Sequence, residues 1–139
     1  MAGMTDLQIE KLRSVLEAMS DVRLAVLFGS AATRVLGKRS DLDIGLSLER
    51  DDIILSSIAA NLERAAGRPV DLVLLDTAPP LLRFEIARDG LALVERERHL
   101  WAEFRAHAMI DWWDWAPTAR IAHEAMMRRL RQEAGRGPA

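Results

Sequence analysis

The stretch that decides the fold is VRLAVLFGSAATRVLGKRSDLDIGLSL, residues 22–48. Apolar runs of strand length open and close it, and they predict strands over 22–28 and 41–48. Gly29 ends the first run, and Ser30 is placed to cap a short helix reaching about residue 36. The polar residues 37–40 then predict a turn that leads into the second strand. The stretch therefore reads as strand, short helix, turn and strand.

Two acidic residues lie at the start of the second of these strands. Because side chains at alternate strand positions share a face, Asp41 and Asp43 project together, while Leu42 and Ile44 point to the opposite side. Two like charges so close are unfavourable unless a cation neutralises them. Mg²⁺ takes carboxylate oxygens of this kind and usually keeps water and substrate phosphate as its other ligands. The alternative is an ordinary solvated pair in a turn.

Gly29 and Ser30 add a second feature to the same stretch. Glycine removes the side chain that would block close approach to the backbone. A helix N-terminus offers free N–H groups and a favourable dipole to phosphate, and the serine hydroxyl is a further donor. One strand thus carries the candidate metal ligands, and the preceding turn carries a candidate phosphate site. The combination predicts a site for a metal–nucleotide complex.

Asp71 is a third candidate ligand, and it lies in the apolar run VDLVLL, residues 70–75. A carboxylate in such a run is costly to bury unless it is paired or binds a metal. If this strand lies beside the 41–48 strand, Asp71 faces the same site. Three carboxylates could then bridge two ions, one activating an attacking hydroxyl and one stabilising a leaving pyrophosphate.

The remainder of the chain alternates helices and strands, which is typical of an α/β protein with a helical appendix. Thr5 or Asp6 can cap a first helix. Asp76 reads as a loop or cap residue and not as a ligand. The other predicted elements are a helix from Asp51-Asp52 to about Gly67, a strand over 69–75, a helix from Pro79-Pro80 to Gly90, a strand over 91–94, and two helices from about Arg98 separated by Pro117.

Composition limits the classes of protein to which the chain can belong. With 139 residues it suits one domain, divided here into a core (1–95), a helical extension (96–134) and a frayed tail (135–139). The net charge of −2 argues against stable nucleic-acid binding. We expect no membrane segment, because no apolar run approaches the roughly 18 residues that a span requires. With no secretion signal and no cysteine, a cytoplasmic location is expected.

The spacing of these residues resembles a known signature. Gly29-Ser30, the ten residues 31–40, and then Asp41-Leu42-Asp43 are similar to the nucleotidyltransferase pattern, with Asp71 as its third aspartate. The chain resembles a minimal nucleotidyltransferase (MNT) of the DNA-polymerase-β-like superfamily. The resemblance implies a short mixed sheet flanked by helices, followed by a C-terminal helical appendix.

The same resemblance implies an activity and a role for each residue. AMP would pass from ATP, with Mg²⁺, to a hydroxyl group. Asp41 and Asp43 would hold the metal, and Asp71 would share it and help to deprotonate the acceptor. Gly29 and Ser30 would contact the triphosphate. Arg34 departs from the glycine that many relatives carry, and it either contacts phosphate or is exposed to solvent.

The C-terminal helices carry most of the aromatic residues. One face is expected to pack onto the core, and it consists of Trp101, Phe104, Ala108, Trp112 and Trp115. Trp113 lies off this stripe, where it is either an anchor for a partner or a buried neighbour. The apolar residues after Pro117 are also expected to pack on the core. His99, His107 and His123 have no metal-ligand spacing and are expected at the surface.

Single-domain MNT proteins of this size resemble the antitoxin half of HEPN/MNT toxin–antitoxin pairs. The resemblance implies a HEPN ribonuclease toxin as partner, with AMP transferred to a tyrosine hydroxyl of that toxin. This chain contains no tyrosine, so it is not itself a tyrosine-linked acceptor. Two alternatives remain open at the level of sequence. The chain could neutralise a toxin by binding alone, or it could be a small-molecule nucleotidyltransferase of the antibiotic-modifying type.

Overall fold

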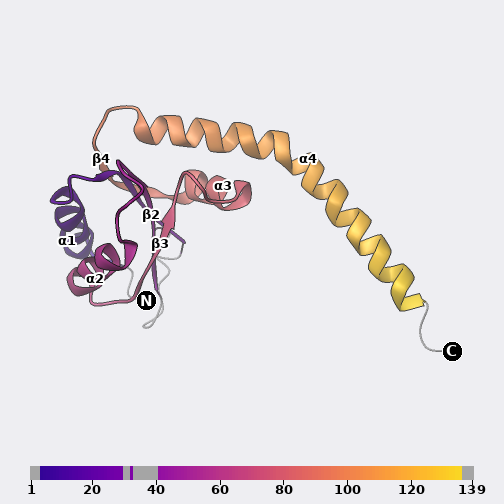
Figure 1. The fold of residues 1–139 in the computed structure, drawn as a ribbon, viewed down its shortest axis with the longest axis horizontal. Helices are drawn as coiled ribbons and strands as arrows, with labels where there is room; N and C mark the ends of the chain where they lie inside the picture. The colour runs from indigo at the N-terminus through magenta and orange to yellow at the C-terminus, as the bar shows by residue number, and fades with distance from the viewer. Residues whose placement is uncertain (1–3, 30–31, 33–40, 136–139) are drawn as a thin grey trace.

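The structure is a computed structural model, and it describes residues 4–29, 32 and 41–135. Within these ranges four strands and four helices follow one another along the chain (Figure 1). In chain order they are α1 (Asp6–Glu17), β1 (Val22–Phe28), β2 (Leu42–Leu48), α2 (Leu55–Ala66), β3 (Val70–Leu74), α3 (Pro80–Asp89), β4 (Leu91–Glu95) and α4 (Leu100–Gly135).

The strands form one mixed sheet in the order β3-β2-β1-β4. Strand β1 pairs antiparallel with β2 and with β4, whereas β2 pairs parallel with β3. The parallel pair needs a crossover connection, which α2 supplies. The short mixed sheet flanked by helices that the sequence predicted is therefore confirmed. Its two central strands, β1 and β2, are the runs that open and close the stretch 22–48.

Helices cover both faces of the sheet, with α1 and α2 on one side and α3 and α4 on the other (Figure 1). The first interface is a core cluster that includes Leu12, Leu16 and Leu62, all with no exposed surface. The second is a separate cluster in which Phe28 and Leu75 pack against α3 and the first turns of α4. Because β2 alternates, its even-numbered residues Leu42, Ile44 and Leu46 enter the first cluster.

Local signals fix several of the helix ends where the sequence placed them. The Thr5 hydroxyl accepts from the Gln8 backbone N–H, and the Gln8 side chain accepts from the Thr5 backbone N–H, which is a complete capping box. Gly67 ends α2 in the left-handed conformation with φ 68°, as glycine does most easily. Pro80 opens α3 and Gly90 caps it.

The predicted start of the second helix is wrong. Helix α2 begins at Leu55, and the residues Asp51 and Asp52 lie in a turn before it. The Arg50 guanidinium lies 3.4 Å from Asp21 and 3.5 Å from Asp52. The charge pattern that resembled a helix N-terminus is thus part of an ion-pair group that joins this turn to the residue before β1, Asp21.

The predicted break at Pro117 is also wrong, since α4 is one helix from Leu100 to Gly135. Proline removes one backbone hydrogen bond and disfavours the preceding turn, at a cost of roughly 3 kcal/mol. Helix formers on both sides of Pro117 let the helix continue, and Figure 1 shows it changing direction partway along its length. A kink in place of a break is the usual consequence of an interior proline.

The packing expected for the residues after Pro117 is wrong as well. Phe104 and Ala108 are buried against the sheet, as predicted for the first part of the aromatic stripe. Beyond it Trp115 is 41% exposed and Trp113 is 73% exposed, and residues 120–135 are all exposed.

The division into 1–95, 96–134 and 135–139 stays a prediction. The helix predicted over 30–36 and the turn over 37–40 lie outside the described residues.

Candidate active site

Two of the predicted carboxylates lie side by side at one edge of the sheet. In the parallel pairing of β2 with β3, Asp43 is the register partner of Asp71. Register partners present their side chains on the same face of a sheet. That face is the one covered by α3 and α4, because the neighbours Leu42 and Ile44 point into the α1–α2 core. Asp71 is exposed and Asp43 is partly buried, so neither carboxylate is lost in the apolar interior.

Gly29 contacts Asp43 on the side that faces β1, away from Asp71. It directly follows Phe28, which is the register partner of Asp43 on β1. Its φ of 71° lies in the left-handed region, and a β-carbon built on it would be 2.6 Å from Asp43 Oδ2. Glycine is therefore required here by both backbone conformation and space. The Asp43 carboxylate accordingly lies between β3 and the chain leaving β1.

Asp41 precedes β2 and is exposed. The pKa of Asp43 lies above its ordinary value. Burial is the largest cause, and the negative charges of Asp71 and then of Asp41 raise the pKa further. The three carboxylates are thus electrostatically coupled, with Asp43 at the centre. The two other predicted contacts to nucleotide, Ser30 and Arg34, lie outside the described residues.

Helix α3 contributes side chains that the sequence did not single out. A cavity of about 340 Å³ is lined by Phe28, Gly29 and Asp43 from the sheet side and by Glu85, Arg88 and Asp89 from α3. Arg88 is the one cation among these lining residues. Its Nε donates to Asp89 Oδ2 at 2.9 Å, and its guanidinium lies 5.5 Å from the centre of the Phe84 ring.

No local motif identified Arg88 beforehand, because it shares the cavity with Asp43 only through the docking of α3 on the sheet. An arginine beside a carboxylate pair is suited to bind a phosphate group with two parallel hydrogen bonds. The hydrogen bond to Asp89, and then the charge of Asp89, raise the pKa of Arg88. The cavity therefore holds one cation that stays charged beside the acidic side chains.

The donor set fits magnesium bound together with a nucleotide better than magnesium alone. Across residues 4–29, 32 and 41–135, no three acidic, histidine or cysteine side chains are grouped closely enough to hold a metal ion by themselves. Mg²⁺ needs only one or two protein carboxylates when substrate phosphates and water complete its shell. Asp43 would supply one oxygen ligand, with Asp41 and Asp71 beside it. The ion would offset both the burial of the Asp43 charge and the repulsion from Asp71 and Asp41, which together raise the pKa of Asp43.

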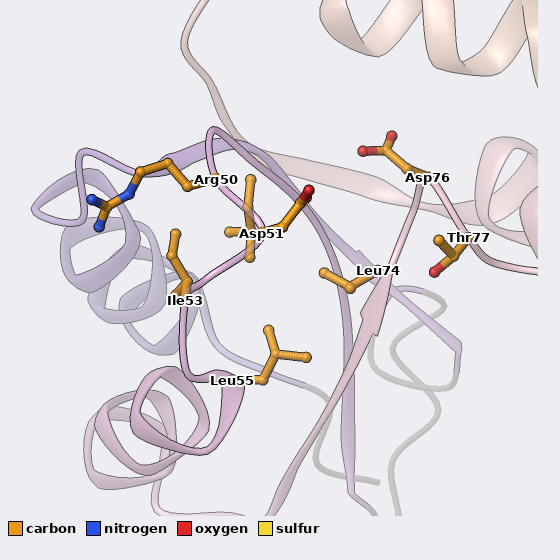
Figure 2. Close-up of a pocket in the computed structure, with 8 residues that line it drawn as sticks. Arg50, Asp51, Ile53, Leu55, Leu74, Asp76 and Thr77 are labelled. Carbon is orange, nitrogen blue, oxygen red and sulfur yellow. The ribbon is translucent and has the colours of Figure 1, made fainter.

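A second cavity, of about 450 Å³, lies at the other end of β2 and β3, beside Leu48 and Leu74. Figure 2 shows Leu74 and Leu55 along it, with the Asp51 and Asp76 carboxylates above them. Arg50 directs its guanidinium away from these carboxylates (Figure 2), toward its partners Asp21 and Asp52. An apolar wall under two carboxylates repels phosphate, so this cavity is unsuited to a triphosphate. Asp76 lies in a turn, as predicted.

A mixed sheet with an Asp pair and a glycine turn at one edge defines a class of protein. The chain belongs to the family described as "Polymerase beta, Nucleotidyltransferase", whose profile matches residues 10–99. The matched residues contain the sheet, Gly29 and all three aspartates. The resemblance inferred from the spacing of these residues is confirmed. Helix α4 lies outside the matched residues.

Several solved chains with the same fold come from toxin–antitoxin complexes. A chain of a toxin–antitoxin crystal structure with AMP-PNP is 24% identical, with a TM-score of 0.72, over 85% of this chain and 98% of that chain. A chain of the MntA–HepT complex is 23% identical, with a TM-score of 0.68, over 88% and 99%. A chain of the complex between tri-AMPylated Shewanella oneidensis HEPN toxin and MNT antitoxin is 24% identical, with a TM-score of 0.69, again over 88% and 99%.

The comparison with curated protein sequences gives no match. The solved chains are matched over nearly their whole length, so the fold of this chain includes theirs. Among the helices in the described residues, none combines the length and the apolar character that crossing a bilayer requires.

Proposed function

We propose that this protein transfers AMP from ATP to a hydroxyl group of a partner protein, with Mg²⁺, and that it acts as the antitoxin of a HEPN-type ribonuclease. One observation carries the proposal. The coupled carboxylates Asp43 and Asp71 lie in register beside Gly29, in a chain of the nucleotidyltransferase family. The solved chains of the same fold, bound to AMP-PNP or to an AMPylated HEPN toxin, support ATP as the donor and a protein as the acceptor.

The reaction is a displacement at phosphorus. The hydroxyl oxygen of the acceptor attacks the α-phosphorus of ATP and forms a new P–O bond. The bond from that phosphorus to the oxygen that bridges to the β-phosphate breaks, and pyrophosphate leaves. Bound Mg²⁺ would supply charge neutralisation at the phosphates and lower the pKa of the attacking hydroxyl. The hydroxyl proton passes to a nearby carboxylate, for which we propose Asp71.

The other residues bind and orient the nucleotide. Asp41 and Asp43 provide carboxylate oxygens at the start of β2. Gly29 allows the triphosphate to approach the backbone, with Ser30 and Arg34 as further candidate contacts. Arg88 faces the same cavity, where a guanidinium would bind a phosphate or the leaving pyrophosphate. A tyrosine acceptor has to come from another protein, because this chain has no tyrosine. We propose that this occurs in the cytoplasm.

The test is to incubate the protein with labelled ATP, Mg²⁺ and a HEPN-type protein, taken from the neighbouring reading frame where that frame encodes one. We expect label and a mass increase of one or more AMP units on the partner. Asp43→Asn and Asp41→Asn should abolish labelling. The matched control is Asp76→Asn, which changes an exposed carboxylate in the turn after β3 and should label as the unaltered protein does. An unlabelled partner, or labelling that survives Asp43→Asn, contradicts the proposal.

Binding alone is a second candidate function, and the exposed part of α4 favours it. Residues 120–135 are entirely exposed and carry several apolar side chains. If the Asp43→Asn variant protects cells from the toxin as well as the unaltered protein does, binding is sufficient for neutralisation. If protection falls together with AMP transfer, the catalytic proposal holds.

A further inference from the structure

Strand β3 is an edge of the sheet, because β2 is its one neighbour among the described strands. Pro69 O accepts a hydrogen bond from β2 just before β3 begins, and Leu75 N–H donates one to β2 just after β3 ends, both at 2.9 Å. Backbone groups alternate in direction along a strand, so the odd-numbered residues of β3 bond to β2. The N–H and C=O groups of Val70, Leu72 and Leu74 therefore point away from the sheet.

The protein pairs one backbone group at each end of this outer edge but none in the middle. Val70 N–H donates to Glu63 Oε1 at 3.1 Å, and Leu74 O accepts from Thr77 N–H at 3.3 Å. Among the residues that the structure describes, no group pairs with the N–H or the C=O of Leu72. Lysine, proline or a bulge usually protects such an edge, and β3 contains no lysine, no proline and no bulge in its pairing with β2. The middle of β3 is therefore open to a further strand.

Leu72 directly follows Asp71, the carboxylate proposed to accept the hydroxyl proton. Asp71, Asp43 and Phe28 are successive register partners across β3, β2 and β1, so they form a row that ends at the open edge. A residue added opposite Asp71 would extend this row. Its side chain would lie on the same face of the sheet, with its β-carbon about 5 Å from that of Asp71. A strand added to this edge would therefore present a side chain to the candidate active site.

The direction of the proposed reaction favours the same edge. In a displacement at phosphorus, the attacking and leaving oxygens lie on opposite sides of the phosphorus atom. The cavity with Arg88, proposed to bind the phosphates, is bounded by Phe28 and Gly29 and so lies on the β1 side of Asp43. Asp71 is exposed on the β3 side of Asp43. If pyrophosphate departs on the β1 side, the acceptor hydroxyl enters from the β3 side.

We infer that the acceptor protein binds as an extended segment that pairs with the open edge of β3 and places its hydroxyl-bearing residue opposite Asp71. An extended backbone is the partner that this edge specifies, because it carries N–H and C=O groups at the same spacing as β3. The identity of that segment as the acceptor rests on the proposed function, whereas the pairing rests on the geometry of β3.

The first test measures amide hydrogen exchange in the full-length protein, alone and with the HEPN-type protein of the transfer assay, in Mg²⁺ and a non-hydrolysable ATP analogue. We expect the Leu72 amide to exchange at least about tenfold more slowly in the complex, because a hydrogen bond to the partner protects it. The amides of β4, at the opposite edge of the sheet, are the control and should keep their rates.

Two results of this measurement overturn the inference. One is an unchanged Leu72 exchange rate with a partner that the protein labels with AMP. The other is a Leu72 amide that is already protected without the partner. Protection that is independent of protein concentration would mean that the chain covers its own edge, and protection that grows with concentration would mean that a second copy does.

A second test removes the Leu72 N–H and keeps the side chain. Replacing Leu72 by its α-hydroxy acid, leucic acid, turns the preceding peptide bond into an ester. The KM for the partner should rise about threefold to tenfold, as for the loss of one hydrogen bond, with kcat nearly unchanged.

The matched control is the same replacement at Leu7, which is 67% exposed in the first turn of α1. N–H groups in a first turn have no partner within the helix, so this ester should keep the KM within about twofold. Thermal unfolding and Mg·ATP binding show whether each ester keeps its fold and its nucleotide site. Equal KM values for the two esters overturn the inference.

Failure of this inference is distinguishable from failure of the proposed function. In the Asp43→Asn protein the partner should still protect the Leu72 amide, although no AMP is transferred. If the unaltered protein labels the partner while neither Leu72 measurement changes, the edge pairing fails and the catalytic proposal stands. If the partner protects the Leu72 amide but receives no AMP from the unaltered protein, the catalytic proposal fails and the edge pairing stands.

Discussion

A β-carbon at Gly29 would lie 2.6 Å from Asp43 Oδ2. The Asp43 carboxylate therefore fits beside the turn after β1 only because residue 29 has no side chain. The first prediction follows from this contact. Gly29→Ala should destabilise the protein by roughly 1–2 kcal/mol through left-handed backbone strain, and it should also displace the Asp43 carboxylate. We expect AMP transfer to fall by at least about tenfold, since small displacements at a reacting centre are costly.

Gly67→Ala is the matched control for this change. Gly67 has nearly the same φ, 68°, but a β-carbon there meets nothing within 4 Å. It should show the same loss of stability in thermal unfolding with full transfer activity. Equal activity of the two variants would show that contact with Asp43 has no catalytic consequence.

The second prediction concerns pH. Burial, and then the charges of Asp71 and Asp41, raise the pKa of Asp43 in the folded state above its unfolded value. Ionisation of Asp43 therefore reduces the free energy of unfolding as the pH rises through the folded pKa. Asp43→Asn should be more stable than the unaltered protein at neutral pH without magnesium. The gain should vanish below the unfolded pKa, where Asp43 is protonated in both states.

Thermal unfolding with Mg²⁺ and a non-hydrolysable ATP analogue tests whether Asp43 is needed for ligand binding. The melting temperature of the unaltered protein should rise, because a ligand that binds only the folded state stabilises it. The Asp43→Asn protein should show little change. A stability gain for Asp43→Asn that persists at low pH would mean that charge is not its cause.

The third prediction concerns Arg88, the cation in the cavity beside Asp43. Arg88→Gln should lower the affinity for Mg·ATP by about tenfold, because a charged hydrogen bond to phosphate is lost. Calorimetric titration with the ATP analogue gives the affinity directly. Arg64→Gln, on α2 across the sheet, is the control and should bind normally. Equal affinities for the two variants would remove Arg88 from the nucleotide site.

The fourth prediction concerns stability alone. Arg96 Nη2 donates to the carbonyl oxygens of Leu16, Glu17 and Met19, at distances of 2.7–3.1 Å. Its Nε donates to Val22 O at 2.9 Å. The side chain thus caps the C-terminus of α1 and complements the helix dipole there.

Arg96→Ala should lower the free energy of unfolding by about 2–3 kcal/mol, because several carbonyls lose a charged donor. Arg98→Ala, two residues later at an exposed position, is the control and should change stability by less than about 0.5 kcal/mol. Denaturant unfolding measures both. Similar values for the two variants would mean that water replaces the cap without cost.

Much of the fold could be predicted from the sequence because its signals are local. The apolar run 22–28 is β1 over the same residues, and Pro80 and Gly90 mark the start and the end of α3. The predictions failed where local signals competed with longer-range contacts. Asp51 and Asp52 resembled a helix start but lie in a turn paired through Arg50. Pro117 resembled a break but lies within a continuous helix.

The candidate site also has features that the sequence determined and features that only the tertiary structure decided. The sequence by itself determined that Asp41 and Asp43 lie two residues apart at the start of one strand and that Gly29 comes at the end of the preceding strand, because covalent spacing sets both. Only the tertiary structure decided that Asp71 stands in register with Asp43, that Arg88 of α3 shares their cavity, and that the end of α4 is left uncovered. Strand register and helix docking depend on which distant surfaces bury one another, and no spacing along the chain specifies that choice.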